Sequence, residues 1–273
     1  RSTKQLSICK LRLNVPSSIP KGHCKSYLKK FMLKILKELY HREQFHPTVW
    51  GIFINPFYFA RKGLWQGIAK LSKQAGGEIL DIGCGQKPYK NLFHYSRYIG
   101  LEIDSPENRA YKKADVFYDG KKIPLETNSF DTVFMSQVFE HAFNPNEILS
   151  EISRVSRPNG LLLMTVPFVW DEHEQPFDFA RYSSFGIKHL LEHHGFQIIS
   201  LEKSINDIRT IFQLINAFLY KKILTRNPYL NLLLTIIFMS PFNILGEIFS
   251  LITPKNNDLY LDNIVLARNI KNA

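Results

Sequence analysis

Residues 77–104, with the sequence GEILDIGCGQKPYKNLFHYSRYIGLEID, say most about how this chain folds. A short apolar run broken by Asp81 leads into a turn that contains Gly83 and Gly85, and a second apolar run ends at Glu102, twenty-one residues after Asp81. A strand, a glycine turn, a helix and a second strand ending in a carboxylate form a nucleoside-binding unit. The glycines let the backbone approach a ligand where a Cβ would collide, and the carboxylate can accept both hydrogen bonds of a ribose diol. Two glycines also occur in ordinary βαβ turns, but the spacing of the two carboxylates favours a cofactor site.

Apolar runs typical of strands alternate with helical periodicity in the rest of the chain. Strands are expected near 78–82, 97–101, 112–116, 131–136, 160–166, 196–202 and 259–267. Helices are expected near 61–75, 88–94, 145–156, 184–194 and 205–224. This alternation predicts an α/β fold: a doubly wound, mostly parallel, seven-stranded sheet with helices on both faces. The last two strands are expected to pair antiparallel, with the residues between them bulging out as an insertion.

The positive charge of the chain is unevenly distributed. The formal net charge is +11, but residues 1–75 hold 15 Lys/Arg against 2 Asp/Glu, whereas residues 76–273 hold 20 against 22. A nucleic-acid groove across the main domain would need Lys and Arg there. The composition therefore predicts no nucleic-acid partner.

Two segments raise the question of a membrane. Residues 27–40 have helical periodicity, with an apolar stripe and lysines away from it, which is typical either of a membrane-surface helix or of a cap helix packed on the main domain. Residues 229–252 are very apolar, but Pro241, Asn243, Gly246 and Glu247 interrupt them, so a single membrane span is disfavoured. A helix pair lying on a membrane or burying a homodimer face is favoured, and burial against the domain's own surface is the plain alternative.

The cysteines and the start of the chain indicate a cellular compartment. Cys9, Cys24 and Cys84 are odd in number and irregularly spaced, so neither a disulfide framework nor a zinc site is expected. The chain starts with polar and basic residues and without the apolar segment of a signal peptide. We expect a cytoplasmic protein, with peripheral attachment to the inner face of the membrane as the variant suggested by the apolar segments.

Residues 76–203 resemble the class I S-adenosylmethionine-dependent methyltransferases. The resemblance rests on the order and spacing of eight short segments: LDIGCG (80–85), GLE (100–102), AD (114–115), IP (123–124), SFD (129–131), VFEH (138–141), EISRV (151–155) and RPNG (157–160). It implies the Rossmann-like methyltransferase fold. Together with the charge and hydropathy patterns described above, it divides the chain into four parts. These are a basic N-terminal extension with an amphipathic helix (1–75), a methyltransferase core (76–204), an apolar helical insertion (205–256), and the final strand and tail (257–273).

The resemblance also implies S-adenosylmethionine as the cofactor and a role for each matching position. Asp81, Gly83 and Gly85 would surround the methionine part, and Glu102 would hold the ribose hydroxyls. Asp115, placed after the third strand, would accept from the adenine amino group. The methionine end and the transferred methyl would lie beside Ser136 and Gln137. Many relatives have a third glycine where this chain continues with Gln86-Lys87-Pro88, although proline is well tolerated in the first turn of a helix.

The loop after the fifth strand gathers the candidate catalytic groups. It resembles a His-x-x-Pro-x-Asp-x-x-Arg-Tyr pattern from a branch linked to polysaccharide or cell-envelope biosynthesis, here His173 to Tyr182. His173 is the candidate base, with Asp178 or Glu174 orienting it; alternatively Asp178 and Arg181 pair to hold the loop. No metal site is predicted, because no ligand spacing supports one around His173, Glu174 and His141.

The sequence thus predicts methyl transfer to an O-nucleophile. The acceptor would be a small molecule, a glycan or a lipid-linked envelope precursor. Two other interpretations remain open. One is a catalytically silent module that serves in binding or assembly. The other is methylation of an isoprenoid or quinone, in an aromatic pocket lined by Trp50, Phe53, Phe57 and Trp170.

Overall fold

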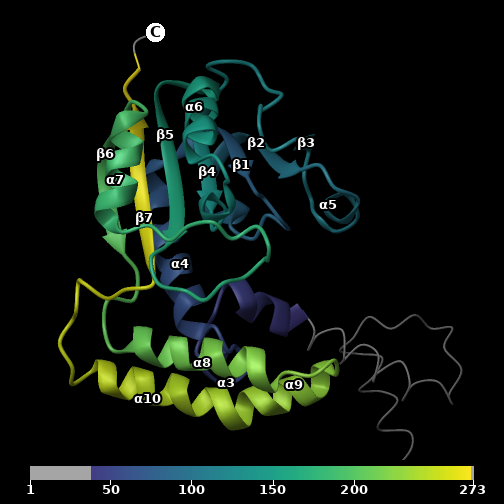
Figure 1. Ribbon diagram of the computed structural model, residues 1–273, viewed down its shortest axis with the longest axis vertical. Coiled ribbons are helices and arrows are strands. Elements are labelled where there is room, and N and C mark those ends of the chain that lie inside the picture. Colours follow the sequence, from purple (N-terminus) through teal and green to yellow (C-terminus); the bar gives the residue numbers. More distant parts are fainter. Residues whose placement is uncertain (1–37, 272–273) are drawn as a thin grey trace, which may run out of the picture. The chain divides into compact units, whose positions relative to one another are not determined.

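The protein is described by a computed structural model that covers residues 38–271 (Figure 1). Most of the segment 27–40, predicted as an amphipathic helix, lies outside the described residues. The chain divides between Arg42 and Glu43 into two units, and the account below concerns the second unit.

A seven-stranded sheet forms the centre of this unit, in the order β3-β2-β1-β4-β5-β7-β6. Strand β7 pairs antiparallel with both β5 and β6, and the other pairs are parallel, which confirms the predicted fold class and the terminal antiparallel pair. The strands are β1 (Gly76–Ile82), β2 (His94–Ile103), β3 (Val116–Tyr118), β4 (Phe130–Ser136), β5 (Ser156–Pro167), β6 (Phe196–Lys203) and β7 (Asp262–Asn269).

Helices cover both faces of the sheet because the apolar residues of the central strands alternate. In β1, Leu80 and Ile82 join the core formed with α6 (Pro145–Val155) and α7 (Ser184–His193), whereas Ile79 joins the core formed with α4 (Tyr58–Leu71). The central strands thus contribute buried side chains to an apolar core on each face, and the sheet lies between two layers of helices. Three further short helices are η1 (Ser72–Gln74), η3 (Phe139–His141) and α3 (Gly51–Ile54), of which α3 packs against α10 and η4, described below.

Two predicted elements are wrong in detail. The helix predicted near 88–94 is only a 3-10 turn, η2 (Lys90–Leu92), because Lys87 has a φ of 56° and the chain continues at once into the long strand β2. The third strand starts at Val116, since the apolar residues lie at 116–118 and the preceding Lys112 and Lys113 are exposed. A helix that the sequence reading missed, α5 (Pro106–Tyr111), connects β2 with β3 and is capped by Ser105.

The predicted insertion forms a helical layer at one end of the sheet (Figure 1). Helix α8 (Arg209–Ile223) packs along α10 (Ser240–Ser250), which follows α9 (Pro228–Leu234) and the π-helical turn η4 (Thr235–Met239) without a break. Within the described residues, the helix Pro228–Ser250 is the one stretch whose length and mean hydropathy of 1.8 would suffice to span a membrane.

That helix is nevertheless tied to the rest of the unit by polar contacts. Asn243 donates to the carbonyls of Ile52 and Asn55 at 2.9 and 3.0 Å, and it accepts from Asn216 of α8 at 2.9 Å. Glu247 is paired with Lys62 of α4 at 2.7 Å. A membrane-spanning arrangement would have to break all of these contacts.

Candidate functional site

The glycine turn after β1 is hydrogen-bonded to the end of β2. The Gly83 N–H donates to the Leu101 carbonyl at 2.9 Å, and a Cβ at Gly83, where φ is +69°, would lie 2.3 Å from Val138. The Gly85 N–H donates to Glu102 Oε1 at 2.6 Å, whereas a Cβ at Gly85 would meet nothing within 4 Å. The backbone at Gly85 therefore borders open space beside a largely buried carboxylate, which suits the approach of a ligand.

Asp81 lies beneath this turn and is buried. Its Oδ2 accepts from the Tyr98 hydroxyl at 2.7 Å. Burial raises the pKa of Asp81 to about 7, against the opposing effects of the Tyr98 hydrogen bond and the Lys87 charge. Near neutral pH the Asp81 carboxyl therefore populates both its neutral and its charged form.

The prediction for Asp115 needs a correction. Asp115 precedes the third strand instead of following it, and its Oδ2 accepts from the Gly100 N–H at 2.7 Å and pairs with Lys87 Nζ at 2.5 Å. The carboxylate that does follow the strand is Asp119, which the sequence reading missed because it placed the strand at 112–116. Asp119 comes directly after Tyr118, and Phe117 of the same strand lies opposite Glu102 of β2.

Polar side chains at the ends of β4, β5 and β7 meet on the other side of the glycine turn. Ser136 Oγ lies 2.9 Å from Thr165 Oγ1, and Gln137 Nε2 donates to Thr165 Oγ1 and to Asp262 Oδ1, both at 3.2 Å. Burial raises the pKa of Asp262 to about 6. Gln137 has a φ of +56°, so the backbone turns sharply as it leaves β4.

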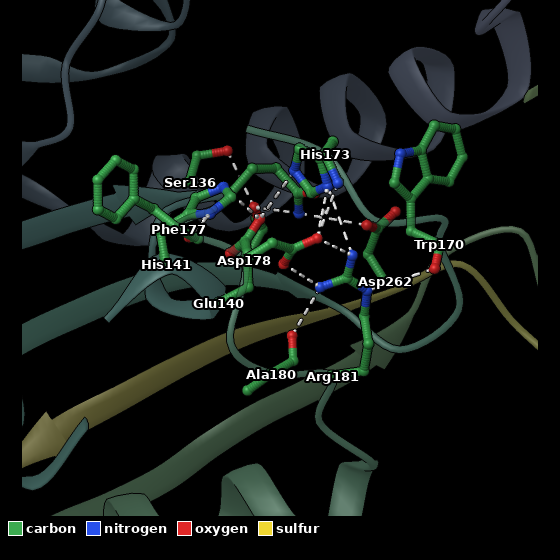
Figure 2. A network of polar contacts seen from close by, with 12 residues as sticks. Ser136, Glu140, His141, Trp170, His173, Phe177, Asp178, Ala180, Arg181 and Asp262 are labelled. Carbon is green, nitrogen blue, oxygen red and sulfur yellow. Dashed lines mark hydrogen bonds and ion pairs between the residues drawn. The ribbon is translucent and has the colours of Figure 1, made fainter. Parts of the chain in front are cut away.

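Asp178 is the centre of the loop after β5 (Figure 2). Its two carboxylate oxygens accept from Arg181 at 2.6 Å each, and its Oδ2 also accepts from the His173 N–H at 2.9 Å and lies 3.3 Å from His173 Nδ1. The Arg181 guanidinium holds the pKa of Asp178 well below its usual range, and burial lowers the pKa of His173. Asp178 therefore both holds the loop, through Arg181, and orients the imidazole, so the two alternatives considered for it are compatible.

The structure does not bring Glu174 to His173. Glu174 is exposed, and no hydrogen bond or ion pair joins its carboxylate to the imidazole in the described part of the chain. The acidic group near the imidazole, besides Asp178, is Glu140, whose Oε1 lies 4.0 Å from His173 Nε2 and 3.9 Å from His141 Nε2.

Glu140 is the group that sequence reading undervalued. Its side chain is fully buried, and neither carboxylate oxygen has a hydrogen-bond partner among the described residues. Burial raises the pKa of Glu140 to about 8. Glu140 and His141 belong to one of the segments that carry the family resemblance, but only the fold brings His173 to them. The backbone N–H groups of Phe179 and Ala180 donate to the Glu140 carbonyl at 2.9 and 3.2 Å.

Only part of the predicted aromatic wall assembles. Phe57 contacts Trp170 of the loop after β5, with ring centroids 5.7 Å apart, and Tyr220 of α8 at 4.6 Å. Trp50 and Phe53 form a separate pair at 6.5 Å and are both exposed. The predicted four-residue pocket is thus reduced to Phe57 and Trp170, with Tyr220 added.

Comparison with known proteins identifies the part of the chain that carries the glycine turn. Residues 80–164 match the family model described as "Methyltransferase domain". The chain contains a class I S-adenosylmethionine-dependent methyltransferase domain. The matched residues run from the middle of β1 into β5, so this methyltransferase domain includes the glycine turn, Glu102, Ser136 and Gln137 but not the loop that holds His173.

Curated relatives agree with this assignment. The chain is 27% identical over 204 residues to an uncharacterized chloroplastic methyltransferase of Arabidopsis thaliana, covering 68% of this chain and 55% of that protein. It is 28% identical over 165 residues to a probable S-adenosylmethionine-dependent methyltransferase of Mycolicibacterium smegmatis, covering 55% of this chain and 63% of that protein. The chain therefore spans less than two thirds of the length of these relatives.

The structural comparison supports the fold alone. Phosphoethanolamine N-methyltransferase 2 of Haemonchus contortus, solved in complex with S-adenosyl-L-methionine, superimposes with a TM-score of 0.50 at 19% identity. The superposition covers 84% of this chain and 59% of that one. The sheet order and mixed pairing described above are those of a Rossmann-like methyltransferase fold.

Proposed function

We propose that the protein transfers a methyl group from S-adenosylmethionine to an oxygen nucleophile. The observation that carries this proposal is the glycine turn, with open space in front of Gly85 and the Glu102 carboxylate hydrogen-bonded to its N–H at 2.6 Å. When bound, the sulfonium supplies an electrophilic methyl group, so the protein needs only to bind, align and exclude water.

Residues at the carboxyl ends of the strands would each contact a different part of the cofactor. Glu102 would use its second oxygen for the ribose hydroxyls, and Asp119, one strand further along the same edge, would face the adenine. Asp81, Gly83 and Gly85 would border the methionine part. Ser136 and Gln137, held by Thr165 and Asp262, would lie beside the sulfonium end. Two of these carboxyls, Asp81 and Asp262, have pKa values raised by burial to about 7 and 6, so a cationic ligand would favour their charged forms.

The loop after β5 would receive the acceptor. His173 is oriented through Nδ1 by Asp178, so its Nε2 faces Glu140 and can engage the nucleophilic oxygen either directly or through a bound cation. Phe57 and Trp170 would form one apolar wall beside it. Burial lowers the pKa of His173, which favours the neutral imidazole with a free lone pair.

A sugar hydroxyl or carboxylate on a lipid-linked or envelope precursor is the acceptor class we favour. The supporting observation is the link between the loop and the apolar helical layer: Lys221, near the end of α8, pairs with Asp171 of the loop at 2.8 Å. Helix α10 and the turn after it expose apolar side chains, among them Ile248, Leu251 and Ile252. An acceptor with a polar head and an apolar tail could thus place its head at the loop after β5 and its tail along the helical layer.

Calorimetry with S-adenosylmethionine tests the proposed cofactor site. Replacing Glu102 with Ala removes a charge-assisted acceptor, and each such hydrogen bond contributes about 1.5–3 kcal/mol, so the affinity should fall roughly 10- to 100-fold. Glu192→Ala, which removes an exposed partner of Lys188 on α7, is the matched control and should bind like the parent protein. Unchanged affinity in the Glu102 variant would refute the assignment.

A further inference from the structure

We propose that Glu140, His141 and His173 bind a divalent first-row transition-metal cation beside the proposed cofactor crevice. The three side chains offer one carboxylate oxygen and two imidazole nitrogens, all within 4.8 Å of one another. They come from two segments: η3, directly after β4, and the loop after β5 (Figure 2). The fold assembles the cluster by pairing the backbone of that loop with the Glu140 carbonyl.

The state of Glu140 is an independent indication of a missing partner. A carboxyl group with no accessible surface and no hydrogen bond to either oxygen loses its hydration without compensation, which costs several kcal/mol if it is charged. Buried charges in proteins are paired or coordinate metals. A cation between Glu140 and the two imidazoles would supply the partner that the described residues do not.

Both imidazoles are already set for coordination through Nε2. His141 Nδ1 lies 2.6 Å from the Phe177 carbonyl, which can only accept, so Nδ1 carries the proton and Nε2 the lone pair. His173 Nδ1 lies 3.3 Å from Asp178 Oδ2 and from the Asp171 carbonyl, and 3.4 Å from Arg181 Nη2. The two acceptors favour a proton on Nδ1, which leaves the lone pair on Nε2. Metal-binding histidines are oriented in this way by a carboxylate or a carbonyl behind the ring. Asp178, held in turn by Arg181, is the positioning residue for His173.

The donor set decides the kind of cation. Two imidazoles and one carboxylate suit Zn²⁺, Fe²⁺, Co²⁺ or Mn²⁺ better than Mg²⁺ or Ca²⁺, which prefer oxygen ligands. The separations of 3.9 and 4.0 Å from Glu140 Oε1 to the two Nε2 atoms exceed the roughly 3.3 Å expected around a tetrahedral ion with bonds of about 2.0–2.1 Å. Small side-chain rotations would close this difference. Three protein ligands leave a coordination position for a further group.

The consequence for the acceptor rests on the proposed function, although the binding of the cation does not. An acceptor hydroxyl bound at the remaining position would have its pKa lowered by the cation and would release its proton to water. The Nε2 lone pair of His173 cannot bind a cation and accept a proton at once. His173 would then act as a ligand, and the cation would replace it as the group that activates the acceptor.

The test measures Co²⁺ binding by the full chain after treatment with a chelator. Calorimetry and visible absorption should report one Co²⁺ per chain with bands of a low-coordinate nitrogen–oxygen site. Glu140→Gln and His173→Ala should each weaken binding at least tenfold, and Asp178→Asn should weaken it about 10- to 100-fold through the lost orientation of His173. Pulsed electron paramagnetic resonance of the unmodified protein with Mn²⁺ should detect two coordinated imidazole nitrogens, which keeps the test informative where a variant fails to fold.

A second pair of histidines provides the control. His189 and His193 lie one turn apart on α7, both exposed, and form the site at which an adventitious cation would bind. The double variant His189→Ala/His193→Ala should retain the binding. If it abolishes Co²⁺ binding while Glu140→Gln leaves binding intact, or if the unmodified protein binds no Co²⁺, the proposed site is refuted. S-adenosylmethionine affinity, measured separately on Glu140→Gln, should be unchanged, so failure of the metal site and failure of the cofactor site are distinguishable.

Discussion

At the scale of single residues, the protonation of Asp81 affects both the stability of the folded domain and the binding of the proposed cofactor. Burial under a backbone turn favours the neutral form of this carboxyl, whereas the charged form would attract a cationic ligand. The groups that face it are the Tyr98 hydroxyl, Lys87 and Glu102, and desolvation outweighs the first two. The unliganded fold therefore favours the protonated form up to about pH 7.

Asp81→Asn should remove a defined part of the pH dependence of stability. The pKa of Asp81 is about 7 in the folded chain and 3.8 in the unfolded reference, so between these values the folded state binds a proton that the unfolded state does not. The free energy of unfolding should therefore fall as the pH rises through this window, by at most about 1.4 kcal/mol per unit, and level off above pH 7. Urea denaturation at several pH values would measure it.

The Asn variant lacks this titration, so its stability relative to the parent protein should increase from pH 5 to pH 8. Glu192→Gln, a change in an exposed ion pair, should instead run parallel to the parent at every pH. Parallel curves for Asp81→Asn as well would show that Asp81 does not titrate in this range.

Residue identities were predictable from the sequence only where a motif fixes the backbone. Gly83 and Gly85 have positive φ, and Glu102 directly follows the short apolar run 98–101 of β2, so the pattern alone located them. Asp119 was missed because three apolar residues are too few to fix the limits of a strand from the sequence. Glu140 gave no signal of its own, since its isolation and its closeness to His173 depend on how two loops pack.

At the scale of elements, the helical layer depends on a few buried amides. Asn243 of α10 satisfies two carbonyls in the segment before α4 and one amide of α8, and Gln213 of α8 accepts from the backbone N–H groups of Phe59 and Ala60. Sequence periodicity predicted helices here but could not predict this attachment. Asn243 looked like an interruption of an apolar segment, whereas in the fold it is the contact that positions the segment.

Asn243→Leu should therefore destabilise the protein despite raising the apolarity of α10. The change removes the donor to the Ile52 and Asn55 carbonyls, and the Asn216 amide keeps only its hydrogen bond to the Met239 carbonyl. Each unsatisfied buried group costs about 1–3 kcal/mol. Thermal or urea unfolding should show a loss of roughly 2–5 kcal/mol. Asn257→Leu, the same replacement at an exposed loop position, should change stability by less than about 0.5 kcal/mol. Equal effects of the two changes would mean that the amides do not hold the layer.

At the scale of the whole unit, one face of the helical layer has no counterpart in the described chain. Ile237, Ile244 and Ile248 recur at intervals of seven and four residues and are all exposed, so they follow one face of the continuous helix α9–η4–α10. The opposite face carries Asn243, Gly246 and Glu247, which contact the domain. This helix is therefore anchored through polar groups on one side and presents apolar side chains outward on the other.

Vesicle binding is the property that this arrangement predicts. The C-terminal part of α8 and the loop after it carry Lys221, Lys222 and Arg226, so anionic vesicles should bind the protein more strongly than neutral ones, and added salt should weaken the binding. Ile248→Glu/Leu251→Glu places two charges on the apolar face and should reduce co-sedimentation with anionic vesicles at least tenfold. Phe185→Glu, an equally drastic change at an exposed aromatic residue of α7, should leave binding intact because that helix lies on a face of the sheet. If light scattering instead shows a dimer that the double variant dissociates, with no vesicle binding by the parent, the face is a contact between two copies of the chain and the membrane proposal fails.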